Sequence, residues 1–127
     1  MREIEFRLRY KDKSWFYGVP LSKIKEDTVA FKSFDGNYYD LMAIATTLGQ
    51  YTGLCDKNGT KIFEGDIVKV YLAYKTIVCI VKWEDCGYVL QDIKIQDYKY
   101  SMGKSFELEV IGNIYDNPEL LEVADGR

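Results

Sequence analysis

The chain has 127 residues, a formal net charge of −3 from 17 basic and 20 acidic side chains, and no histidine. Its length fits one domain or two very small ones, and a hydrophobic fraction of 47% with 15% aromatic residues can fill a core, which excludes a disordered chain. The lack of histidine removes the commonest general base and metal ligand, and the charge balance lacks the basic surplus typical of strong nucleic-acid binders.

The first predicted elements are strands. Residues 4–10 alternate between hydrophobic side chains, beginning with Ile4, and charged side chains, which predicts a strand with one face in the core. The polar segment 11–14 then predicts a turn into a second strand over 15–19, so the two should form a hairpin. A third strand is predicted over 28–34, where it meets an Asp-Gly turn pair.

Residues 38–48 fit two structures. Leu41, Ile44, Ala45 and Leu48 have helical spacing, whereas the tyrosines at the start of the segment and two later threonines favour a strand. Both alternatives stay open from the sequence.

The next segment is rich in turn signals. A short extended piece over 50–54 is followed by Asp56-Lys57-Asn58-Gly59, which predicts a tight reversal into 60–63 because Asn-Gly tolerates a positive φ. Gly65-Asp66 predicts a second tight entry, into a strand, with the aspartate accepting hydrogen bonds from turn amides. We expect a set of structural turn residues here: Thr52, Gly53, Asp56, Asn58, Gly59, Gly65 and Asp66.

The rest of the chain predicts four strands and one helical turn. The strands cover 67–74, 76–84, 87–95 and 106–115. Asn117-Pro118-Glu119 then has the residue order of a helix start, with Asn as the cap and Pro in the first turn, and the two leucines that follow should dock back onto the sheet.

No residue pattern indicates a catalytic centre. Cys55, Cys79 and Cys86 have neither the even number of a disulfide framework nor the spacing of a zinc site, and no phosphate-binding glycine motif occurs. The acidic pairs 64/66, 84/85 and 107/109 are interpreted as solvated turns or sheet faces. We therefore expect no catalytic residue, no cofactor, no metal and no enzymatic activity.

Surface aromatics are the feature with functional potential. Eight tyrosines exceed what one small core can bury, so some should form a contact surface: Tyr38, Tyr39, Tyr51, Tyr71, Tyr74, Tyr88, Tyr98 and Tyr100. Because the second half of the chain is acidic, a protein interface, either with further copies of the chain or with another protein, is favoured over a nucleic-acid platform. The alternative hypothesis is nucleic-acid contact through the N-terminal basic residues, chiefly Arg7 and Arg9.

Several segments resemble the YopX protein family. The resemblance lies in Gln50–Leu54, Asp56–Gly59 and Lys61–Val68, with further similarity in Arg2–Arg7 and Val110–Leu121. Cys55 departs from the pattern, since the family usually has a charged or polar residue there. The resemblance implies a small protein encoded by a bacteriophage or prophage, with no established activity and therefore no catalytic residues to carry over.

The predicted fold is mainly β (β-rich α+β). We expect an N-terminal β-hairpin region over 1–61 and, over 62–127, an SH3-like small barrel with a C-terminal helical turn. The longest hydrophobic runs are five residues, 41–45 and 77–81, too short to cross a bilayer, so no membrane partner is expected. The resemblance to the YopX family implies a cytoplasmic location in a bacterial host.

Overall fold

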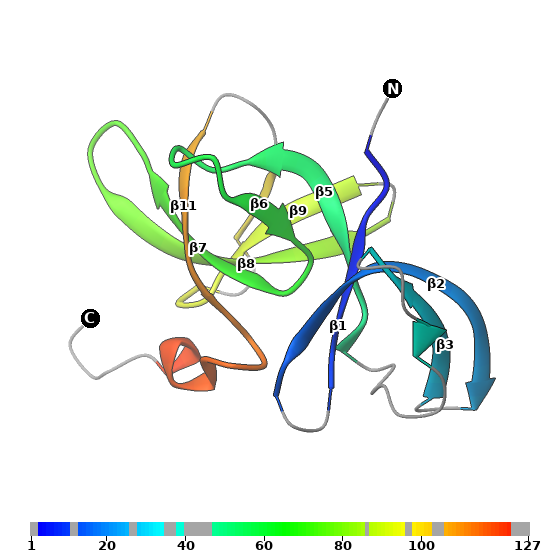
Figure 1. Cartoon of the computed structure of the whole chain (residues 1–127). Helices are drawn as coiled ribbons and strands as arrows, with labels where there is room; N and C mark the ends of the chain where they lie inside the picture. Colours follow the sequence, from blue (N-terminus) through cyan, green and yellow to red (C-terminus); the bar gives the residue numbers. More distant parts are fainter. Residues whose placement is uncertain are drawn as a thin grey trace. The chain divides into compact units, whose positions relative to one another are not determined.

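The computed structural model describes residues 3–10, 13–25, 28–34, 38–39, 47–85, 87–95, 98–102 and 106–122. At 22–25, 28–29 and 38–39 it describes the backbone but not the side chains. The chain divides into two compact units, Met1–Gly53 and Leu54–Arg127 (Figure 1). The predicted boundary lay between residues 61 and 62. Nearly all regular structure in the described residues is antiparallel strand, so the expected mainly β class is confirmed.

Most strands of unit 1 belong to a six-stranded sheet with the order β4-β3-β2-β1-β5-β6. Its first five strands are β1 (Phe6–Arg9), β2 (Trp15–Lys25), β3 (Thr28–Ser33), β4 (Tyr38–Tyr39) and β5 (Gly49–Cys55). Strand β5 crosses the unit boundary, and β6 (Lys61–Phe63) belongs to unit 2. The predicted hairpin between β1 and β2 is confirmed, with Phe6 opposite Gly18 and Arg9 opposite Trp15. For 38–48 the sequence left helix and strand open. The structure describes only 38–39, which form β4, and 47–48, because 40–46 lie outside the described residues.

The prediction of a half-buried first strand is wrong. Strand β1 pairs with β2 on one side and with β5 on the other, so it is an interior strand of its sheet. Arg7 and Leu8 lie on opposite faces of β1 and are both buried, whereas Ile4, which was expected in the core, precedes β1 and is exposed. Leu8 and Phe31 form the centre of the unit 1 core.

Unit 2 contains a five-stranded sheet with the order β10-β9-β8-β7-β11. Its strands are β7 (Asp66–Tyr71), β8 (Thr76–Glu84), β9 (Gly87–Asp92), β10 (Lys99–Ser101) and β11 (Glu107–Asn113). The predicted strands β7, β8, β9 and β11 are confirmed, whereas β10 was missed. No pairing between β10 and β11 is found among the residues the structure describes, so a closed barrel is not observed.

One face of this sheet carries the core of unit 2. The side chains that form it are Ile62, Val68, Val70, Cys79, Val81, Leu90 and Leu108. Ile62 comes from β6 (Lys61–Phe63), which follows the end of β5 through a tight turn. Each fully buried aliphatic side chain contributes about 1.5–3 kcal/mol relative to exposure to water, so this cluster is the main stabilising element of the unit.

The predicted helical turn is confirmed as a short 3-10 helix, η2 (Pro118–Leu121). Asn117 occupies the cap position but makes no side-chain capping bond. Its Oδ1 instead accepts a hydrogen bond from the backbone N–H of Asn113 at 3.2 Å. Leu120 lies beside β11, where a Cβ built at Gly112 would be 3.0 Å from its Cδ1, and Leu121 lines a small pocket together with Ile80 and Ile93.

We expect Gly112→Ala to destabilise the protein. A Cβ at Gly112 would lie 2.6 Å from Oδ1 of Asn117 and 3.0 Å from Cδ1 of Leu120, so η2 would have to move away from β11. The expected loss in the free energy of unfolding is about 1–3 kcal/mol, measured by urea denaturation. Gly87→Ala is the matched control because a Cβ there meets nothing within 4 Å, and an equal loss in both variants would contradict the prediction.

Candidate functional site

The turn over residues 56–60 is the best-defined polar feature of unit 2. The backbone N–H of Asp56 donates to the carbonyl of Thr60 at 2.8 Å, and the N–H of Gly59 donates to the carbonyl of Asp56 at 3.0 Å. Gly59 has φ of 86°, in the left-handed region that glycine adopts without steric cost. The tight reversal predicted from Asn-Gly is therefore confirmed.

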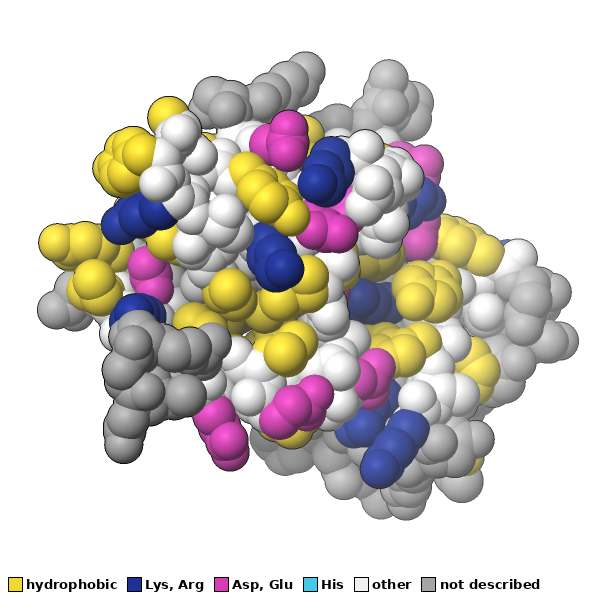
Figure 2. All heavy atoms as spheres, turned by 90° about the vertical axis from the view of Figure 1, so that its left-hand side faces the viewer, with side chains coloured by type: hydrophobic (Ala, Val, Ile, Leu, Met, Phe, Trp, Pro, Cys, Tyr) yellow, Lys and Arg dark blue, Asp and Glu magenta, His cyan; other side chains and the backbone are white. Residues whose placement is uncertain are grey.

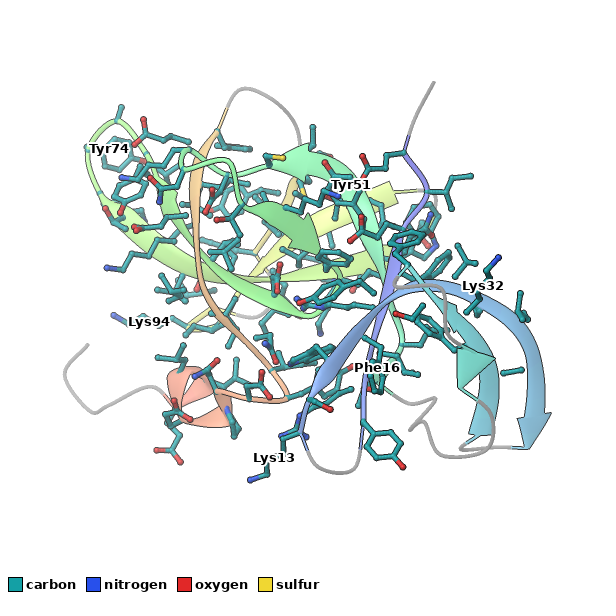
Figure 3. All side chains as sticks on the ribbon, in the orientation of Figure 1. Lys13, Phe16, Lys32, Tyr51, Tyr74 and Lys94 are labelled. Atoms are coloured by element: carbon teal, nitrogen blue, oxygen red, sulfur yellow. The ribbon has the colours of Figure 1, made fainter. Side chains whose placement is uncertain are left out.

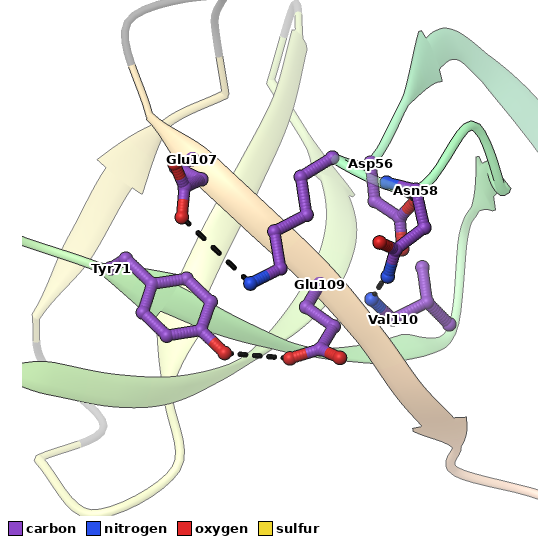
Figure 4. Close-up of polar contacts among 7 residues, drawn as sticks. Asp56, Asn58, Tyr71, Glu107, Glu109 and Val110 are labelled. Atoms are coloured by element: carbon purple, nitrogen blue, oxygen red, sulfur yellow. Dashed lines mark hydrogen bonds and ion pairs between the residues drawn. The ribbon is translucent and has the colours of Figure 1, made fainter.

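The Asp56 carboxylate holds this turn together and ties it to a distant strand. Its Oδ1 accepts hydrogen bonds from the N–H groups of Asn58 and Thr60, both at 2.9 Å, and its Oδ2 accepts one from the N–H of Val110 at 2.9 Å (Figure 4). The neighbouring N–H of Lys57 donates to the carbonyl of Leu108, also at 2.9 Å. The turn thereby occupies backbone groups along the outer edge of β11, which pairs with β7 on its other side.

These hydrogen bonds lower the pKa of Asp56. Burial raises the pKa of the carboxyl, but the hydrogen bonds from Val110, Thr60 and Asn58, together with the charge of Lys57, outweigh burial, and the pKa falls below its ordinary value of 3.8. The turn over residues 56–60 therefore depends on an ionised carboxylate that accepts hydrogen bonds from backbone N–H groups.

Four side chains surround the turn on the surface of unit 2. The Lys57 ammonium lies 4.4 Å from the centroid of the Tyr71 ring and 3.9 Å from Oε2 of Glu107. The Tyr71 hydroxyl donates a 2.6 Å hydrogen bond to Oε1 of Glu109 (Figure 4). This hydrogen bond favours the neutral phenol and raises the pKa of Tyr71. These contacts hold the Lys57 side chain of the turn against residues of β7 and β11.

A second aspartate closes the other predicted turn. Asp66 is buried, and its Oδ2 accepts a hydrogen bond from the N–H of Phe63 at 2.8 Å across the turn between β6 and β7. Gly65 has φ of 87°, and its carbonyl accepts from the N–H of Ile114 at 2.9 Å. This junction therefore also connects the turn to the end of β11.

The remaining predicted turn residues have other placements. Thr52 and Gly53 lie within β5 rather than in a turn, although Gly53 does have a positive φ, of 90°. Asn58 takes part in its turn through its backbone N–H. The predicted set thus divides between two turns and one strand.

The two arginines proposed for nucleic-acid contact do not form an open basic surface. Arg7 is buried, and its guanidinium lies over the ring of Trp15 at 4.6 Å from the centroid. Arg9 is half-buried, and its backbone N–H donates to Oγ1 of Thr47. Arg7 was expected as an exposed contact, but its side chain is buried.

The tyrosines are distributed between core and surface. Tyr51 is buried, and Tyr71, Tyr88 and Tyr100 are half-buried. Tyr74 and Tyr98 are exposed, whereas the side chains of Tyr38 and Tyr39 lie outside the described residues.

Sequence reasoning missed Asp92. This buried carboxylate accepts hydrogen bonds from the N–H groups of Lys94 at 2.7 Å and Ile95 at 3.1 Å, which turns the chain out of β9. Burial, with a further contribution from Asp92, raises the pKa of the Cys79 thiol to about 12. Asp92 lies inside the strand predicted over 87–95, and an aspartate there, a residue depleted in strands and common in turns, is the sequence signal that could have indicated the earlier end of β9.

The described residues offer no metal-binding group. Among them, no cluster of three or more His, Cys, Asp or Glu side chains could hold an ion. Cys55 is exposed and Cys79 is buried, whereas Cys86 lies outside the described residues. No helix in the described part of the chain is long and apolar enough to cross a membrane.

The YopX protein family model matches residues 5–122, nearly the whole chain. The chain belongs to the YopX family. The matched region includes the Asp56 turn and the Gly65-Asp66 junction, so the segments that resembled the family in sequence build the polar connections to β11.

This YopX chain also has a similar solved structure. The crystal structure of protein EF1440 from Enterococcus faecalis aligns with a TM-score of 0.59 at 23% identity, covering 96% of this chain and 100% of that one. At this identity the similarity shows the fold alone. None of the curated proteins compared with the chain matches it significantly.

We expect Asp56→Ala to lower the free energy of unfolding by about 2–4 kcal/mol, because three N–H groups lose a charged acceptor. Urea denaturation measures the loss. Asp116→Ala is the control, since Asp116 is exposed and accepts a hydrogen bond from the Asn113 side chain. Equal stability of the two variants would show that the turn does not depend on the carboxylate.

The contribution of Asp56 should also depend on pH. A carboxyl whose pKa is lowered in the folded state stabilises fully above its unfolded pKa, near 3.8, and loses this effect as the pH falls through the lower folded value. The difference in unfolding free energy between the wild type and Asp56→Asn should therefore be constant near neutral pH and shrink in acid. A difference that does not change with pH would contradict the assignment.

Proposed function

We propose that this YopX protein is a non-enzymatic binding or assembly module that acts through protein–protein contacts. The supporting observation is a set of large hydrophobic side chains on the surface of unit 2. Tyr74 is 84% exposed, Trp83 54%, Tyr98 53% and Ile95 45%. Exposed aromatic residues supply large contact areas at low entropic cost, which is why they are enriched at protein interfaces.

The distribution of charge supports a protein partner over a nucleic acid. Figure 2 shows one face of the molecule, on which hydrophobic side chains are interspersed with both basic and acidic ones. Nucleic-acid binding draws most of its affinity from a continuous basic surface. With Arg7 buried, no observation on the described residues favours the nucleic-acid alternative.

The proposal has two further parts that rest on the family resemblance and on the strand order. We place the protein in a bacteriophage or prophage and in the cytoplasm of the bacterial host. We also propose that the five-stranded sheet forms an SH3-like small barrel, because β11 returns beside β7, the first strand of that sheet, as in small partly open barrels.

Site-specific photo-crosslinking tests the proposed function. A photoreactive phenylalanine analogue is introduced at Tyr74 or Tyr98 in the organism that encodes the chain, and crosslinked species are identified by mass spectrometry. We expect one discrete protein, either a partner or a second copy of the chain, at these two positions. Glu119, an exposed position on η2, is the control and should give no such product.

The absence of any discrete crosslinked protein at Tyr74 and Tyr98, with the variants folded, would contradict the proposed function. Crosslinks to nucleic acid would support the alternative instead. Sedimentation of the purified protein at increasing concentration separates self-association from binding to another protein.

A further inference from the structure

A hydrophobic groove of about 460 Å³ lies on unit 2, where β8 begins and β9 ends. Two short segments of the chain form its walls, residues 75–78 on one side and residues 92–95 on the other. Ligand pockets in proteins have volumes of about 300–1,000 Å³, so the groove is large enough to take a large side chain of another molecule.

The groove lies where β8 and β9 separate. The pairing of the two strands reaches Cys79 opposite Asp92. The Asp92 carboxylate then accepts hydrogen bonds from the N–H groups of Lys94 at 2.7 Å and Ile95 at 3.1 Å, so the chain turns out of the sheet. The residues of β8 that precede Cys79 therefore lie beside the departing chain, with the groove between the two segments.

Backbone hydrogen bonds hold both walls of the groove in place. The N–H of Ile93 donates to the carbonyl of Val78 at 3.1 Å and joins the two walls, and the N–H of Leu72 donates to the carbonyl of Lys75 at 2.9 Å at the start of β8. A groove that is already formed costs less to bind into than one that must first be ordered. Because these backbone groups are paired within the chain, recognition in the groove would use side chains.

The lining of the groove is mainly hydrophobic. Four side chains supply it: Ile77, Val78, Ile93 and Ile95. Ile77 also packs against the core cluster of unit 2, whereas Ile95 is 45% exposed. A hydrophobic side chain that enters the groove would therefore contact the margin of the core and cover Ile95, and both effects remove hydrophobic surface from water.

The groove has one lysine on each wall. Lys75 and Lys94 both line it and are exposed, and Figure 3 shows Lys94 pointing away from the ribbon. Among the described lining residues the one carboxylate is that of Asp92, which is buried and accepts hydrogen bonds from backbone N–H groups. The accessible charges of these lining residues are therefore basic and complementary to acidic groups.

We propose that this groove binds a large hydrophobic side chain of a partner protein, from a segment that carries acidic residues on both sides of it. The hydrophobic side chain would pack on Ile77 and Ile95, and the acidic side chains would lie near Lys75 and Lys94. A second copy of the chain docked symmetrically through the same groove would bring the lysines of both copies together, which disfavours it. The inference rests on the proposed function and specifies the chemistry of the partner.

The test uses the full-length protein and a capped synthetic peptide in which glutamates flank a single phenylalanine. NMR of the isoleucine methyl groups should show saturable shifts at Ile77, Ile93 and Ile95. A peptide with serine in place of the phenylalanine should not bind, because nothing fills the groove. A peptide with lysines in place of the glutamates should also fail, because like charges would meet at the rim.

Protein variants at exposed positions separate the two contributions. Lys94→Glu should weaken binding of the glutamate peptide about fivefold, in line with the modest strength of exposed ion pairs. Lys13→Glu changes the net charge equally at an exposed position of unit 1 and should leave the affinity unchanged. Ile95→Ser removes part of the hydrophobic lining and should weaken binding about tenfold. Ile4→Ser makes the same change at an exposed position of unit 1 and should have no effect.

The outcomes are separable from those of the proposed function. No binding of the glutamate peptide, equal binding of the glutamate and lysine peptides, or shifts confined to residues outside the groove would overturn the inference even if Tyr98 crosslinks to a partner. Self-association that shifts the same methyl groups at rising protein concentration would overturn it in favour of a second copy. The absence of crosslinking at Tyr74 and Tyr98 would instead refute the proposed function.

Discussion

The hydrogen bond from the Val110 N–H to the Asp56 carboxylate is the constraint on which unit 2 depends most. It joins a turn to a strand 54 residues away in the sequence, while the same carboxylate also accepts two N–H groups of the turn itself. One ionised side chain thereby fixes the turn, its position and the covering of the β11 edge. The lowered pKa of Asp56 is the electrostatic consequence, because the donors stabilise the charged form.

The segments that resemble the YopX family use their polar side chains for hydrogen bonds within the fold. The carboxylates of Asp56 and Asp66 both accept hydrogen bonds from backbone N–H groups, and Tyr71 donates its hydroxyl to Glu109. Protonation of either carboxylate would weaken the bonds that hold its turn, because these bonds favour the charged form. Both aspartates therefore contribute to the positions of their turns.

The sequence by itself determined the β class, most strands and both aspartate turns, because alternation, Asn-Gly and Gly-Asp act over a few residues. It could not determine which side chains other parts of the chain cover, so Arg7 was expected on the surface although it is buried, with its guanidinium over the Trp15 ring. It also placed Thr52 in a turn and missed β10, whose three residues form a strand through pairing with β9. Only the tertiary structure decided that Val110 is a partner of Asp56, since this contact joins residues distant in the sequence.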